Sequence, residues 1–156
     1  MSFVVVIPAR YDSTRLPGKP LLEIAGKSMI QRAWEGAKQS SADVVIVATD
    51  DRRIYEAARD FGAEAEMTST DHSSGSDRVQ EVVQNIGLSL DQIVVNVQGD
   101  EPLLPPELID RVAINLKKKA SAGIATLASA LTNDSDFNNP NVVKIVRDRD
   151  EFALYF

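Results

Sequence analysis

Short apolar runs alternate with stretches of helical periodicity over the first three quarters of the chain. Runs typical of buried strands occupy residues 4–7, 44–48 and 93–97, with a shorter run near 63–67. Between them, apolar residues recur at helical spacing over 29–39 and 51–61. Because strands and helices alternate, the pattern predicts βαβ units and an α/β fold, with a mostly parallel central sheet flanked by helices.

Local signals predict where several helices begin and end. Gly62 is a natural helix stop after residue 61, and the polar stretch 68–77 ends like a helix N-cap. The buried stripe of the helix that follows is predicted to contain Val79, Val82, Val83 and Ile86. Pro105 and Pro106 begin a further helix, whose apolar positions are Leu108, Ile109, Val112 and Leu116.

The pattern is weaker after residue 121. Apolar residues favour strands at 124–131, 142–146 and 152–156. We see no internal repeat, low-complexity tract or linker, and 156 residues with 44% hydrophobic content suffice for one core. We therefore predict a single domain over residues 1–156.

Composition excludes several classes of function. The formal net charge of −6 argues against a general nucleic-acid binder, which is usually basic. The absence of cysteine excludes disulfides, a thiol nucleophile and cysteine-ligated metals, and the single histidine, His72, excludes a multi-histidine metal centre. With no bilayer-length apolar stretch and no basic leader segment, we expect a cytoplasmic protein without membrane insertion.

The loop after the first run concentrates positive charge. Arg10, Arg15 and Lys19 lie there beside Gly18 and three prolines. Guanidinium and ammonium groups neutralise phosphates, a glycine lets backbone N–H groups approach phosphate oxygens, and prolines stiffen the loop. The loop is therefore a candidate phosphate-binding segment, although an ordinary basic surface loop is the alternative.

Residues 25–28, Ala-Gly-Lys-Ser, look like the end of a P-loop. A P-loop requires a glycine five positions before Gly26, but position 21 is Leu21, and the segment does not directly follow a buried strand. We therefore interpret Gly26 and Lys27 as a turn before a helix and reject a P-loop kinase or ATPase.

A second group of polar residues follows the run 93–97. Gln98, Gly99, Asp100 and Glu101 stand where ligands bind in open α/β sheets, outside the carboxyl ends of strands. Asp100 could hold Mg²⁺, a hard cation commonly bound by one or two carboxylates together with substrate phosphates. The alternative is an ordinary turn aspartate after a glycine.

The loop 71–78 is a third candidate. Its serines, Gly75 and backbone groups could contact a base or a ribose, and Arg78 could point back at the ligand. A merely capped helix carrying a surface arginine and histidine is the alternative.

Taken together, these segments resemble the 3-deoxy-manno-octulosonate (Kdo) cytidylyltransferases. The resemblance rests on residues 7–10, 13, 15–21, 48–50, 71–72, 75–78 and 96–102, in this order, and runs over essentially the entire chain. It implies a Rossmann-like nucleotidyltransferase domain that uses CTP and Mg²⁺ to activate Kdo, with release of pyrophosphate, for lipopolysaccharide biosynthesis.

The resemblance also implies roles for individual residues. Arg10, Ser13, Arg15 and Lys19 would bind the triphosphate, with Arg10 and Lys19 stabilising charge during the reaction. Asp100 would hold the metal and act with them in catalysis. The residues around the cytidine or near the sugar would be Ala9, His72, Ser74, Gly75, Arg78 and Gln98.

Family members continue past residue 156, so we expect this chain to be an N-terminal part. The remainder would supply a second metal-binding aspartate, much of the Kdo pocket and the contacts of a homodimer. Two alternatives remain open. One is a cytidylyltransferase for another acidic sugar, such as 8-amino-Kdo or a sialic acid, and the other is a non-catalytic Rossmann-like nucleotide-binding module.

Overall fold

A computed structural model describes residues 2–12 and 16–156. The chain divides into two compact units, Met1–Ala125 and Thr126–Phe156, which are described separately. The single domain expected over 1–156 stays a prediction. Within the described residues, no helix is long and apolar enough to cross a lipid bilayer.

A four-stranded sheet forms the centre of the first unit. Its strands are β1 (Val4–Ala9), β4 (Val44–Thr49), β5 (Glu64–Met67) and β6 (Val94–Asn96), in the order β5-β4-β1-β6. Every neighbouring pair is parallel, and Val4 of β1 is paired with Val44 on one side and with Val94 on the other. These strands confirm the predicted parallel α/β sheet.

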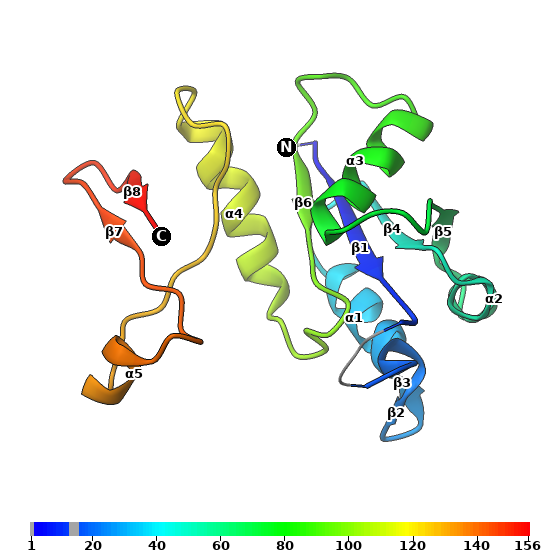
Figure 1. Cartoon of the computed structure of the whole chain (residues 1–156). Helices are drawn as coiled ribbons and strands as arrows, with labels where there is room; N and C mark the ends of the chain where they lie inside the picture. The colour runs from blue at the N-terminus through cyan, green and yellow to red at the C-terminus, as the bar shows by residue number, and fades with distance from the viewer. Residues whose placement is uncertain (1, 13–15) are drawn as a thin grey trace. The chain divides into compact units, whose positions relative to one another are not determined.

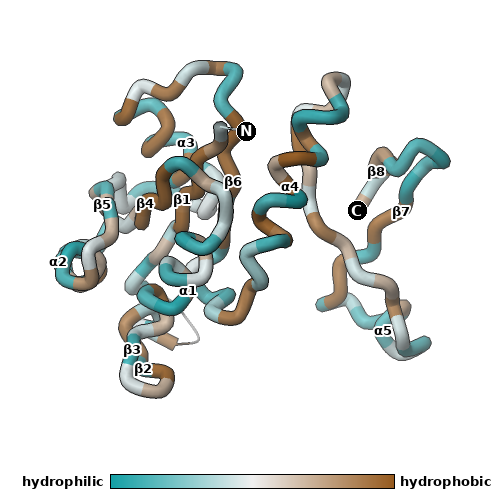
Figure 2. Tube along the Cα trace, turned by 180° about the vertical axis from the view of Figure 1, so that it is seen from behind, coloured by the Kyte–Doolittle hydropathy of each residue, from teal (hydrophilic) through white to brown (hydrophobic). Residues whose placement is uncertain are grey.

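Helices cover both faces of this sheet (Figure 1). They are α1 (Met29–Ala37), α2 (Arg52–Asp60), α3 (Gly75–Asn85) and α4 (Pro106–Lys118). Val5 and Ile7 of β1 pack in one core cluster with residues of α1, α2 and α4, whereas Val4 and Val6 pack on the opposite face with Val82 of α3. Figure 2 shows the apolar strands between these helices. Successive strand residues point to opposite faces, so β1 contributes to both cores.

The helix starts follow from capping residues. Ser28, Asp51 and Ser74 are the N-caps of α1, α2 and α3, and their side chains accept backbone N–H bonds. One expectation for α3 is wrong. Val82 is fully buried as predicted, but Ile86 is 36% exposed and Arg78 is completely buried. Ile86 is the C-cap of α3, where the helix ends.

Residues 25 and 26 form a turn before α1, so the turn predicted at Gly26 and Lys27 lies one residue earlier, and Lys27 is in a short strand. β2 (Glu23–Ile24) and β3 (Lys27–Ser28) pair antiparallel, and Ala25 and Gly26 between them have φ angles of 49° and 78°. These two short strands were not predicted, because two residues are too few to show a period.

The second unit contains α5 (Asp134–Asn138) and an antiparallel pair, β7 (Val146–Arg147) with β8 (Ala153–Tyr155). The predicted strand at 152–156 corresponds to β8, but the one at 142–146 is reduced to its last residue. The strand predicted at 124–131 is wrong, because these residues, all described, form no strand. Ile124, Leu127 and Leu131 are exposed, and apolar residues alone do not supply the hydrogen-bonded neighbour that a strand needs.

Candidate functional site

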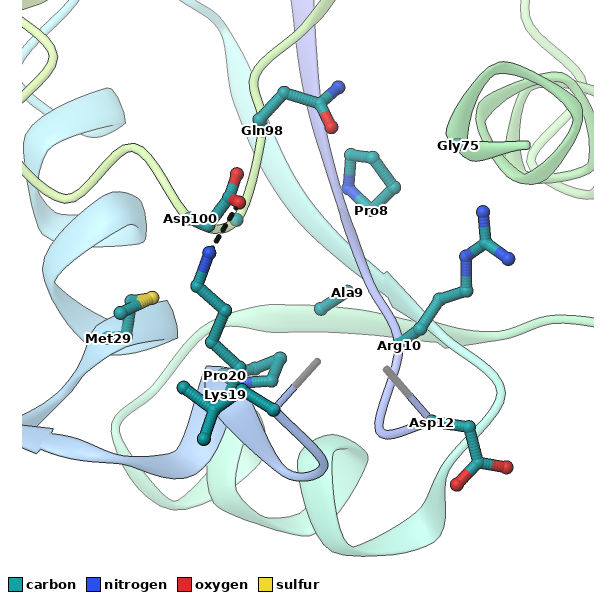
Figure 3. Close-up of a pocket in the computed structure, with 12 residues that line it drawn as sticks. Pro8, Ala9, Arg10, Asp12, Lys19, Pro20, Met29, Gly75, Gln98 and Asp100 are labelled. Atoms are coloured by element: carbon teal, nitrogen blue, oxygen red, sulfur yellow. Dashed lines mark hydrogen bonds and ion pairs between the residues drawn. The ribbon is translucent and has the colours of Figure 1, made fainter. Parts of the chain in front are cut away.

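A cavity of about 870 Å³ lies in the first unit beside the carboxyl ends of β1 and β6 (Figure 3). β1 and β6 are neighbours in the sheet. From β1 the chain continues to β4, which lies on the opposite side of β1 from β6, so the strand order reverses between β1 and β6. Open α/β sheets bind ligands at such a reversal. The residues that line the cavity are Pro8, Ala9, Arg10, Asp12, Leu16, Lys19, Pro20, Met29, Gly75, Gln98, Gly99 and Asp100.

Lys19 is held by a closed loop after β1. The Gly18 N–H donates to the carbonyl oxygen of Tyr11 over 2.8 Å, and Lys19 begins the short 3-10 helix η1 (Lys19–Leu21). Gly18 has a φ of 69°, and a Cβ there would lie 3.1 Å from the Tyr11 ring. Both observations favour glycine at this position. The loop thus presents the Lys19 ammonium at the cavity.

Asp100 reaches the same place from β6. Its Oδ2 accepts a hydrogen bond from Lys19 Nζ over 2.7 Å, drawn as a dashed line in Figure 3. The two side chains are 35% and 51% exposed, so solvent reaches the pair. The backbone at Gly99 lies against β1, because a Cβ there would be only 3.1 Å from the Pro8 carbonyl oxygen. This close approach brings residues 81 positions apart into one ion pair.

Arg10 connects β1 with the segment before α3. Its Nη2 donates to the Ser73 carbonyl oxygen over 3.0 Å, and its side chain extends towards the end of α3 that carries Gly75 (Figure 3). Gln98 lies nearby and donates from Nε2 to Asn96 Oδ1 over 2.8 Å. Arg10, Gly75 and Gln98 therefore share the cavity with Lys19 and Asp100.

Ser74 and His72 lie outside the lining within the described part of the chain. Ser74 and Asp77 form a capping box, in which hydrogen bonds from the Ser74 and Ser73 hydroxyls lower the pKa of Asp77. His72 contacts the Glu81 carboxylate. The Ser69 backbone N–H donates to Glu81 Oε2 over 2.9 Å. This hydrogen bond, together with the contact to His72, lowers the pKa of Glu81. These contacts hold the segment before α3 in place.

Arg78 is neither a surface residue nor part of the described cavity wall. Its guanidinium is buried and forms an ion pair with Asp50, 2.5 Å between Nη2 and Oδ2. The expected contact of Arg78 with a ligand stays a prediction.

Two predicted phosphate-binding residues, Ser13 and Arg15, lie outside the described residues. Conversely, the cavity includes Asp12, Leu16 and Met29, which the sequence did not indicate as site residues. Met29 is the first residue of α1 and was interpreted only as part of an apolar helix face. No local signal distinguishes a core residue from one at a cavity rim.

The donor set suits one kind of metal. Among residues 2–12 and 16–156, no group of three or more acidic or histidine side chains is arranged to hold an ion. A lone exposed carboxylate such as Asp100 fits Mg²⁺, which keeps several waters and takes further ligands from substrate phosphates. The cavity lining thus combines two basic side chains, Arg10 and Lys19, with two carboxylates, Asp12 and Asp100, and Gly75 at the N-terminus of α3.

Comparison with known proteins agrees with this geometry. A family model described as "Cytidylyltransferase" matches residues 4–156. This chain belongs to the cytidylyltransferase family. The parallel sheet with a polar cavity at its carboxyl edge is thus the nucleotidyltransferase fold of a family member.

Several curated relatives of this chain carry one name. A protein from Cellvibrio japonicus named 3-deoxy-manno-octulosonate cytidylyltransferase is 59% identical over 156 residues, which is 100% of this chain and 61% of that protein. A protein of the same name from Vibrio vulnificus is 56% identical, over 100% of this chain and 62% of that protein. The chain thus spans about three fifths of the length of the curated relatives it matches.

Solved structures resemble the chain as well. A structure of CMP:2-keto-3-deoxy-manno-octonic acid synthetase complexed with CTP superposes with a TM-score of 0.92 at 42% identity, covering 99% of this chain and 63% of that one. A cytidylyltransferase from Leptospira borgpetersenii, 23% identical with a TM-score of 0.60 over 74% of this chain and 48% of that one, shares the fold.

Proposed function

We propose that this chain carries the nucleotide-binding part of a Kdo cytidylyltransferase. The observation that carries the proposal is the Lys19–Asp100 ion pair on the wall of the cavity at the β1 and β6 edge. An ammonium beside a carboxylate supports a site for phosphates and a divalent ion. The 56–59% identity to relatives named 3-deoxy-manno-octulosonate cytidylyltransferase supports CTP and Kdo as the substrates.

The reaction requires positioning and charge neutralisation. A hydroxyl oxygen of Kdo forms a bond to the α-phosphorus of CTP, the bond from that phosphorus to the bridging oxygen breaks, and pyrophosphate leaves with the electron pair. The sugar hydroxyl loses its proton to solvent. No covalent protein nucleophile is needed.

The chain's own residues have defined roles in this proposal. Lys19 and Arg10 bind the triphosphate and stabilise the negative charge that develops on the leaving pyrophosphate. The N-terminus of α3, at Gly75, presents the positive end of the helix dipole to the same cavity. Ala9 and Gln98 line the cavity where the nucleoside and sugar would lie.

Asp100 fits a Mg²⁺ ion brought with the nucleotide. The ion would supply neutralisation of phosphate charge when bound. Asp100 is paired with Lys19 in the structure. Binding then replaces this ion pair with Lys19–phosphate and Asp100–metal contacts, so neither charge is left without a partner.

The proposal includes a place in lipopolysaccharide biosynthesis, a homodimer and a cytoplasmic location, all of which follow from the sequence expectations above. Kdo is preferred to 8-amino-Kdo or a sialic acid, because the relatives at 56–59% identity all carry the Kdo name. A non-catalytic binding module is not favoured, since the family match covers residues 4–156.

Calorimetric titration of the chain with CTP and with UTP, both with Mg²⁺, tests the nucleotide half of the proposal. We expect CTP to bind at least tenfold more tightly than UTP. The sugar half is tested by pyrophosphate release with Kdo, 8-amino-Kdo or a sialic acid as acceptor, where Kdo should give the highest rate. Equal affinity for CTP and UTP would contradict the nucleotide half of the proposal. A higher rate with another acceptor than Kdo would contradict the sugar half.

A further inference from the structure

Arg78 is the largest side chain that is completely buried among the described residues. Its guanidinium contacts two other segments of the chain, at Asp50 and at residues 68–69. Nη2 lies 2.5 Å from Asp50 Oδ2, and Nη1 donates to the Thr68 hydroxyl and, over 3.4 Å, to the Ser69 carbonyl oxygen. Arginine suits such a junction because its planar fork donates in several directions at once.

The partners of Arg78 mark the ends of two strands. Asp50 follows β4 directly, and Thr68 follows β5 and donates its N–H to the Thr49 carbonyl oxygen over 2.9 Å. Arg78 itself lies in the first turn of α3. The guanidinium therefore connects the beginning of α3 with the carboxyl ends of β4 and β5.

The chemistry of this junction indicates a geometric role. A buried ion pair gives up the hydration of both charges, and apolar residues of similar volume often stabilise a fold equally well. In addition, Arg78 Nε has no hydrogen-bond partner among the described residues. An arginine with one unsatisfied N–H is a poor choice for stability alone, whereas it fixes three segments in one arrangement.

The beginning of α3 belongs to the cavity wall. Gly75 lines the cavity, and a Cβ there would lie 3.3 Å from Pro8 Cγ and 4.0 Å from Gln98 Nε2. Ser73, two residues earlier, accepts the hydrogen bond of Arg10. A shift of α3 along the sheet would therefore move both Gly75 and the partner of Arg10.

We propose that Arg78, paired with Asp50, is a positioning residue that fixes the N-terminus of α3 as one wall of the nucleotide cavity. It acts through Gly75 and Ser73 and is not itself among the residues that line the cavity. The consequence for nucleotide affinity rests on the proposed function, whereas the positioning itself does not.

Hydrogen exchange without ligand tests the positioning directly. The amides to follow are those of Thr68, Ser69, Ser74 and Asp77, each of which donates an identified hydrogen bond near the junction. We compare Arg78→Met, which removes the guanidinium, and Arg78→Lys, which keeps a charge for Asp50 but loses the fork. Val82→Ala is the matched control, because Val82 is fully buried on the same helix one turn further on.

Each variant is measured at the same number of degrees below its own melting temperature. Compared with Val82→Ala, we expect Arg78→Met to increase the exchange rate of these amides at least tenfold, and Arg78→Lys to increase it by a smaller factor. The affinity for CTP with Mg²⁺ should fall at least fivefold in both Arg78 variants and stay within twofold of wild type in Val82→Ala. Arg78→Lys alone carries the comparison if Arg78→Met does not fold.

Exchange and affinity like those of Val82→Ala would overturn the proposal and leave Arg78 a purely structural residue. The proposed function and the positioning role of Arg78 are tested by separate measurements. If the wild-type chain binds no CTP, the proposed function fails, while the exchange rates still decide whether Arg78 positions α3.

Discussion

Two residues of the cavity wall, Lys19 and Asp100, carry opposite charges and lie close together. Lys19 and Asp100 form an ion pair at 2.7 Å that remains partly exposed to solvent, and such a pair contributes only about 0–1 kcal/mol to stability. The pair is therefore easily separated by a ligand that offers a better partner to each charge. A triphosphate with a divalent ion does so.

Removing the ammonium should weaken nucleotide binding without unfolding the chain. Because a hydrogen bond to a charged group contributes about 1.5–3 kcal/mol, Lys19→Met should raise the dissociation constant for CTP about 10- to 100-fold by calorimetry. The control is Lys117→Met, in the last turn of α4, which should leave the constant unchanged. An unaltered constant in Lys19→Met would exclude Lys19 from phosphate binding.

A methyl group at position 99 tests the close approach of β1 to the Asp100 turn. The Cβ of Gly99→Ala would lie 3.1 Å from the Pro8 carbonyl oxygen and 3.2 Å from Ile30 Cδ1. Because a backbone oxygen cannot move aside alone, we expect a loss of about 1–3 kcal/mol in the free energy of unfolding, together with weaker CTP binding. Gly123→Ala, where a Cβ meets nothing within 4 Å, should change neither the free energy of unfolding, measured by urea titration, nor the affinity for CTP.

At the scale of elements, the site depends on how the segment before α3 is held. Glu81 on α3 accepts from the Ser69 N–H and contacts His72, and both interactions favour its ionised form. The folded-state pKa of Glu81 is thereby lowered from 4.5. Its stabilising contribution is present above pH 4.5 and is lost as the pH falls through the lowered value.

Glu81→Gln should therefore destabilise the chain at neutral pH and less so in acid. We expect a loss of about 1 kcal/mol in the free energy of unfolding at pH 7, which shrinks as the pH falls below 4.5, measured by urea unfolding at several pH values. Glu64→Gln on β5, whose side chain is exposed, serves as control. A loss that stays constant with pH would show that the Glu81 charge plays no part.

Helices and strands were predicted correctly where the sequence showed a clear apolar run or a clear helical period. β1 and β4 are buried runs, and the helices α1, α2 and α3 begin at recognisable caps. The strand expected at 124–131 failed, because a hydrophobic pattern reports which residues are apolar and not whether a neighbouring strand exists. Ile124 is 86% exposed.

At the scale of the whole molecule, topology explains why part of the site could be predicted. The carboxyl ends of parallel strands gather at one edge, so the residues after β6 were expected where ligands bind, and Asp100 lines the cavity there together with Lys19. The burial of Arg78 could not be predicted, because its partner Asp50 lies 28 positions earlier and no periodicity links them. Met29 was missed because its position on an apolar helix face does not distinguish a core residue from one that lines a cavity.

Binding of CTP with a divalent ion held at Asp100 is tested by the Mg²⁺ dependence of CTP affinity in wild type and in Asp100→Asn. This substitution keeps the size of the side chain and removes its charge. We predict that Mg²⁺ strengthens CTP binding at least tenfold in wild type and less than twofold in Asp100→Asn. An equal effect of Mg²⁺ on both, or no effect on the wild type, would contradict the account.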